Sequence, residues 1–185
     1  LDGPDLPTRL ANVDEVLALP FDRIGPERLL TAHCYRHEDL VRSGRRQRAA
    51  AALADAEGLV RRYPHPYWNW GTRTWRVLEH IDAGDLELAE HLAAEAAASR
   101  PGIGEAVACH GVNLVNIRLY QGRAGEVIAL LRAAVEASPH IPTYRAVLAL
   151  CLVEAGDPEA GHEHVRHFTD AGLRNLPHDT NWLLA

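Results

Sequence analysis

Lysine and methionine are both absent from this sequence of 185 residues, and it contains only two phenylalanines and three cysteines. A P-loop nucleotide site requires a lysine that contacts the phosphates, so the chain has no such site of its own. All 19 basic residues are therefore arginines, and 25 acidic residues give a net charge of −6. Because basic patches dominate the affinity for nucleic acids, we expect no direct nucleic-acid contact.

The few cysteines and the short apolar runs indicate a cellular compartment. Cys34, Cys109 and Cys151 lie far apart, without C-x-x-C spacing, which indicates buried thiols in a reducing environment. No run approaches the ~18 apolar residues of a membrane span, and no stretch reads as a signal peptide. We therefore expect a cytoplasmic protein that does not contact membranes. Because the sequence begins at Leu1, we expect it to be a fragment of a longer chain.

An internal repeat is the main pattern in the sequence. Four glycines, each closing a stretch of helical periodicity, recur at intervals of 34 to 40 residues: Gly44, Gly84, Gly122 and Gly156. Glycine favours the left-handed backbone conformation in which many helices end. Small residues follow at a fixed distance, with alanine twelve residues after the first three of these glycines. The pattern predicts a repeated helix–turn–helix.

Helical periodicity predicts where the helices lie. A first helix is expected over residues 5–18, and Pro20, Gly25 and Pro26 then break the chain. Four helix pairs follow, at 27–42 with 46–62, 67–82 with 85–99, 104–120 with 124–137, and 142–155 with 158–171. Near the end, Asp179 or Thr180 is expected to cap the start of a further helix. No stretch alternates as a strand does, so the sequence predicts an all-α fold.

The 34–40-residue unit is similar to the tetratricopeptide repeat. Alanine stands five residues after glycine in two units, as in that pattern: Gly44/Ala49 and Gly84/Ala89. The fourth unit departs from it, with Gly161 and Phe168 where alanines are expected. The resemblance implies a tetratricopeptide-like α-solenoid of stacked helix hairpins. We expect a single domain over 1–185, with about four hairpins at 27–62, 67–99, 104–137 and 142–171 and a partial unit at each end.

A second resemblance covers nearly the whole chain. The stretches YWNWGTRTWRVLEHIDAGDLELAEHLAAEA and LRNLPHDTNWLLA resemble the C-terminal helical region of large actinobacterial-type regulators. Those proteins carry an AAA-type or STAND ATPase module, often with a cyclase-homology or DNA-binding domain. The resemblance implies a non-enzymatic arm that binds a protein partner or a small effector on its concave face. The arm would relay that binding event to an attached ATPase or output domain. The sequence does not decide whether the arm forms a homodimer.

Aromatic residues gather in one short segment of the sequence. Three of the four tryptophans, Trp68, Trp70 and Trp75, lie there close to Arg73. They could form a ledge on which a ligand ring or a partner side chain stacks. Alternatively, they fill space left by the longer repeat. On a helix, Trp68 and Trp75 share a face and Trp70 points elsewhere.

A polar stripe is expected on the helix over residues 104–120. His110, Asn113, Asn116 and Tyr120 share one face of that otherwise apolar helix. Asparagine is a poor helix former, so two of them require a reason. The stripe is a second candidate surface for a ligand or partner. Its alternative is an ordinary solvated face.

The sequence shows no complete catalytic or metal motif. His33 and His37 are one helical turn apart, and His162, His164 and His167 form a second group. A catalytic zinc site requires a third protein ligand, and neither group contains H-E-x-x-H. G-x-S-x-G is also missing. We therefore expect no enzyme activity, no cofactor and no metal. Two alternatives remain, a free-standing peptide-binding scaffold and a metal-binding accessory domain.

Overall fold

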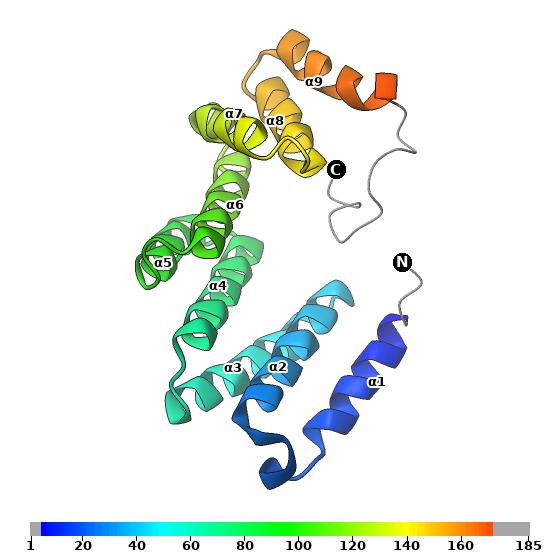
Figure 1. The fold of residues 1–185 in the computed structure, drawn as a ribbon, viewed down its shortest axis with the longest axis vertical. Coiled ribbons are helices and arrows are strands. Elements are labelled where there is room, and N and C mark those ends of the chain that lie inside the picture. The colour runs from blue at the N-terminus through cyan, green and yellow to red at the C-terminus, as the bar shows by residue number, and fades with distance from the viewer. Residues whose placement is uncertain (1–4, 172–185) are drawn as a thin grey trace. The chain divides into compact units, whose positions relative to one another are not determined.

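The computed structural model describes residues 5–171, and this part of the chain consists of helices and the turns that connect them, with no strand. Its helices are α1 (Leu6–Leu17), α2 (Phe21–Arg42), α3 (Arg46–Arg62), α4 (Pro66–Ala83), α5 (Leu86–Ala98), α6 (Gly104–Tyr120), the 3₁₀ helix η1 (Ala124–Val127), α7 (Ile128–Ala137), α8 (Pro142–Glu154) and α9 (Pro158–Ala171) (Figure 1). The all-α prediction is confirmed for these residues. No helix among them is both long enough and apolar enough to cross a membrane. The helix start expected at Asp179 or Thr180 lies outside the described residues.

The four repeated glycines end helices as the sequence predicts, since each has a positive φ. At Gly84, where φ is 83°, the glycine N–H donates to the Ile81 carbonyl and the Asp85 N–H donates to the His80 carbonyl. The same pair of hydrogen bonds recurs at the other three glycines. These bonds satisfy carbonyls that a helix end otherwise leaves without partners.

Two helix starts differ from the sequence prediction. The helix expected from residue 27 begins at Phe21, and Gly25, with φ 69° and ψ 170°, interrupts it. The predicted break is therefore present, but one helical turn precedes it, and Phe21 in that turn stacks on Tyr63 with ring centroids 5.4 Å apart. The helix expected over 124–137 begins as η1 and continues as α7. Short 3₁₀ turns are common at helix N-termini because they tighten the first turn.

The described chain falls into two compact units, which divide within α6 after His110. In the N-terminal unit (residues 5–110), each of the helices α1 to α4 packs against the next helix in the chain. Alanines at helical spacing are buried in α3 and α5, so neighbouring helices approach closely: Ala49, Ala52, Ala56, Ala89, Ala93 and Ala96. The fully buried leucines Leu30 and Leu53 add about 1.5–3 kcal/mol each by removing apolar surface from water.

The C-terminal unit (residues 111–171) has a separate apolar core, to which α6, η1, α7 and α8 contribute buried side chains. Helix α9 packs against α8 at very close range. A Cβ atom on Gly161 would lie 2.7 Å from Cγ2 of Val153 and 2.9 Å from the carbonyl oxygen of Ala149. The glycine that departs from the repeat pattern is therefore required by this contact, because even alanine would collide with α8.

Candidate functional site

The three clustered tryptophans lie on two faces of α4. Trp68 packs on the buried cluster of Leu30, Ala56 and Val60 from α2 and α3. The ring of Trp75 lies 5.8 Å from the ring of His37 on α2. Trp70 points the other way, toward buried alanines of α5 and α6. The predicted opposition of faces is thus present in the N-terminal unit.

Trp70 belongs to the core of that unit. Its side chain is 4% exposed and packs against Ala96 and Ala106. The guanidinium of Arg100 lies 5.4 Å from the ring centroids of both Trp70 and Tyr67, a cation–π arrangement. Burial raises the pKa of the Tyr67 hydroxyl, and the nearby carboxylate of Glu105 adds to that shift. A ligand therefore has no direct access to Trp70 in this arrangement.

The remaining predicted site residues differ widely in exposure. Arg73 is exposed on α4, and Tyr120, at the end of α6, is 71% exposed. Asn113 is buried, whereas His110 and Asn116 are partly buried. The polar stripe on α6 is therefore not a uniformly solvated face.

The histidine groups do not gather around a metal position. Among residues 5–171, no three His, Cys, Asp or Glu side chains are placed to hold a metal ion. Nδ1 of His33 lies 3.9 Å from Oδ2 of Asp55. In the C-terminal unit, His164 lies 3.3 Å from Arg145. Burial lowers the pKa of His164, and the positive charge of Arg145 lowers it further.

A recess of about 540 Å³ opens in the N-terminal unit, beside the C-terminal half of α4. We call it the α4 recess. It lies where α2 and α4 end and α3 begins, so three helices contribute its walls. Its lining residues are Val41, Arg46, Ala49, Ala50, Arg76, Glu79, His80, Asp82, Ala83 and Asp85. Its volume lies within the range typical of ligand sites.

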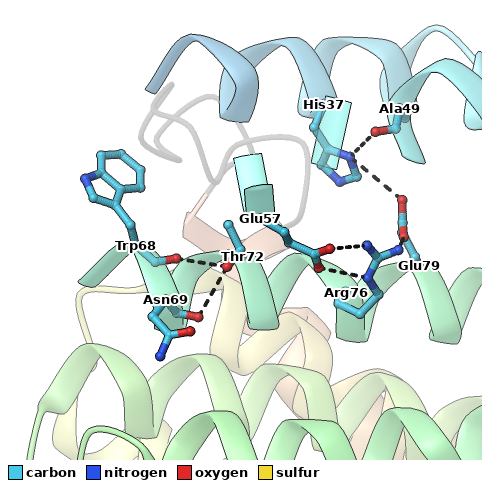
Figure 2. Close-up of polar contacts among 8 residues, drawn as sticks. All are labelled: His37, Ala49, Glu57, Trp68, Asn69, Thr72, Arg76 and Glu79. Carbon is cyan, nitrogen blue, oxygen red and sulfur yellow. Dashed lines mark hydrogen bonds and ion pairs between the residues drawn. The ribbon is translucent and has the colours of Figure 1, made fainter. Parts of the chain in front are cut away.

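A two-point ion pair between α3 and α4 fixes one wall of the α4 recess (Figure 2). Arg76 donates to Glu57 twice, from Nε to Oε1 at 3.1 Å and from Nη2 to Oε2 at 2.8 Å. It also donates through Nη1 to Glu79, one turn further along α4. Hydrogen bonding to Glu57 is the largest cause that raises the pKa of the Arg76 guanidinium. Such planar, two-point pairing fixes orientation as well as charge.

His37 joins this network from α2. Its Nδ1 lies 3.0 Å from the Ala49 carbonyl oxygen and 4.0 Å from Oε1 of Glu79 (Figure 2). A carbonyl oxygen only accepts hydrogen bonds, so Nδ1 carries a proton and donates it. The buried imidazole thus links the wall of the recess to α2, α3 and α4 at once. Figure 2 also shows that Trp68 lies apart from this polar group.

The rim of the α4 recess carries further charges. Arg46, in the first turn of α3, pairs with Asp82 at 3.0 Å. Asp85 lies 3.4 Å from Nδ1 of His80. Both pairs are more solvent-exposed than the Glu57–Arg76 pair, so they hold their side chains less firmly. The recess therefore has a fixed inner wall and an adjustable rim.

Sequence reasoning did not find this recess. Of its polar network, only the spacing of Arg76 and Glu79 within one helix turn is readable from the sequence. Glu57 and Arg76 are 19 residues apart on different helices, and no motif links them. Both arginines of its lining, Arg46 and Arg76, are paired with carboxylates.

No family model, no curated protein and no solved structure matches this chain.

Proposed function

We propose that this chain is a tetratricopeptide-like α-solenoid that acts as a non-enzymatic recognition arm and binds a polypeptide partner at the α4 recess. The observation that carries the proposal is the recess itself, with an inner wall held by the two-point Glu57–Arg76 pair. A wall already fixed before binding loses little conformational entropy when a partner docks. The paired α2–α3 and α4–α5 helices support the repeat architecture.

The resemblance to bacterial ATPase regulators supplies the wider role in this proposal. An effector or partner that binds one arrangement of the arm more tightly than another would shift an attached ATPase or output domain between states. A ligand with equal affinity for both arrangements would change nothing. The flanking coding sequence tests this part. A frame that encodes an ATPase module supports it, and a frame with no such module on either side overturns it.

Selection from a random peptide library displayed on phage tests binding at the recess. The chain would be compared with Ala83→Trp, which places a large ring at the recess from the exposed last residue of α4. The matched control is Ala54→Trp, on an exposed position of α3 that does not line the recess.

We expect enriched peptides to bind the parent chain and the Ala54→Trp control equally. On Ala83→Trp, their affinity should fall by about tenfold or more, the equivalent of 1.4 kcal/mol. Circular dichroism checks that both variants keep their helix content. The proposal fails if no sequence is enriched, or if the enriched peptides bind Ala83→Trp as tightly as the parent chain.

A further inference from the structure

We infer that the α4 recess takes a basic side chain, arginine or lysine, presented by a partner polypeptide. This inference rests on the proposed function and adds the chemistry of the bound group. It combines the imbalance of charge in the lining of the recess with the apolar residues of the same lining.

The lining of the α4 recess has an excess of negative charge. Two arginines, Arg46 and Arg76, face three carboxylates, those of Glu79, Asp82 and Asp85. The positive charge of Arg76 is already engaged twice by Glu57, which stands behind the lining. Glu79 therefore shares an arginine that has another partner. A cation entering the recess would supply the missing positive charge.

The two pairs at the rim, Arg46–Asp82 and His80–Asp85, differ in how they are matched. Arg46 is matched by Asp82, one charge against one. Asp85 faces the His80 imidazole, at 3.4 Å, and no arginine is paired with it among the described residues. Of the three lining carboxylates, only Asp82 is therefore matched one to one by an arginine, because Glu79 shares Arg76 with Glu57. Glu79 and Asp85 line the same recess.

The apolar residues of the lining suit an aliphatic stem. Ala49, Ala50 and Ala83 contribute only methyl groups, and Val41 adds a branched apolar side chain. Arginine and lysine lay their methylene stems along apolar surface while the charged head stays among polar groups. A small inorganic cation would leave this apolar surface uncovered. An acidic side chain would meet the carboxylates and be repelled.

Capped pentapeptides that differ only at the central residue test the inference. That residue is arginine, norleucine or glutamate, and binding to the full chain is followed by the backbone amide resonances of Ala49, Ala50 and Ala83. We expect the arginine peptide to shift these resonances at the lowest concentration, norleucine at higher concentration, and glutamate not at all. Equal or tighter binding of the glutamate peptide would overturn the inference.

A charge-matched pair of variants tests the carboxylates themselves. Asp82→Asn/Asp85→Asn leaves two arginines facing one carboxylate in the recess, and asparagine keeps the preference for the helix start at which Asp85 stands. Glu15→Gln/Glu87→Gln changes the net charge equally, at exposed positions outside the recess. We expect the first pair of substitutions to lower the affinity for the arginine peptide by about tenfold or more, and the second pair to leave that affinity unchanged. If both double variants lose affinity for the arginine peptide equally, the effect comes from net charge alone and the inference is wrong.

Further results distinguish a failure of this inference from a failure of the proposed function. Agmatine carries a guanidinium on an aliphatic stem without a peptide backbone. If agmatine binds as tightly as the arginine peptide, the inference that a polypeptide presents the basic group is wrong. If library-selected peptides depend on the recess but lack basic residues, the inference is wrong and the proposed function stands. If no peptide depends on the recess, the proposed function itself falls.

Discussion

Arg9 on α1 and Asp39 on α2 form a two-point ion pair in which the carboxylate is buried and the guanidinium reaches the surface. Nε of Arg9 donates a hydrogen bond to Oδ2 of Asp39 at 3.2 Å, and Nη2 contacts Oδ1 at 2.7 Å as an ion pair without hydrogen-bond alignment. The Asp39 side chain is 1% exposed, whereas that of Arg9 is 33% exposed. This pair attaches the first helix to the rest of the N-terminal unit.

The unequal burial of the two partners makes their removal unequal. Arg9→Met leaves a carboxylate that has no route to water, so we expect a loss of about 2–3 kcal/mol in the free energy of unfolding, below the full range because Arg9 is partly exposed. Asp39→Asn leaves an arginine that can turn into solvent, and should cost about 1 kcal/mol. Urea denaturation followed by tryptophan fluorescence measures both. A larger loss for Asp39→Asn than for Arg9→Met would contradict this account.

The close contact of α9 with α8 gives a second expectation. Gly161→Ala should destabilise the C-terminal unit by about 1–3 kcal/mol, because the new Cβ would meet Val153 and the Ala149 carbonyl. The better helix propensity of alanine offsets at most about 1 kcal/mol of this. The control is Gly71→Ala on α4, where nothing lies within 4 Å of the added Cβ and stability should rise slightly. Thermal unfolding followed by circular dichroism compares the two, and equal melting would refute the collision.

Burial of His33 predicts how stability depends on pH. Burial lowers the pKa of His33 below its ordinary value of 6.5, against the opposing effect of Asp55. The unfolded chain therefore binds this proton at a higher pH than the folded chain does. Stability should fall as the pH drops below about 6.5 toward the lower folded pKa, by at most about 1.4 kcal/mol per pH unit for this group.

Removing the imidazole should remove that slope. We expect His33→Gln to flatten the pH dependence of urea midpoints between about pH 7.5 and 5.5. The matched control is His91→Gln, at an exposed position of α5, which should leave the slope as it is in the parent chain. An unchanged slope in His33→Gln would show that another group carries the dependence.

The aromatic segment separates core residues from surface residues. Trp70→Ala should lower the free energy of unfolding by about 3–4 kcal/mol, since it removes a buried ring packed on α5 and α6. Arg73→Ala, three residues further along the same helix, should change it by no more than about 0.5 kcal/mol because the side chain is exposed. Denaturation followed by far-ultraviolet circular dichroism distinguishes them. If Trp70→Ala is as stable as the parent chain, Trp70 is not a core residue.

Local structure could be predicted from the sequence because its causes are local. A glycine readily adopts the left-handed conformation in which helices commonly end, and Gly84 and its three counterparts mark helix ends correctly. The apolar period likewise fixes which side chains share a face, and it separated Trp70 from Trp68 and Trp75. The all-α class followed from these signals.

The candidate site could not be predicted because it depends on how helices pack. Helical periodicity predicts that Trp70 and Trp75 lie on different faces of α4, but it does not say which neighbouring helix each of them contacts. Glu57 and Arg76 meet across 19 residues, and Arg9 and Asp39 across 30, only because the rotation and depth of neighbouring helices bring them together. The sequence by itself determined the helices and their ends, through backbone conformation and hydrophobic period. The tertiary structure alone decided which charges are buried, which are paired and where the α4 recess opens, since those depend on contacts between residues far apart in the chain.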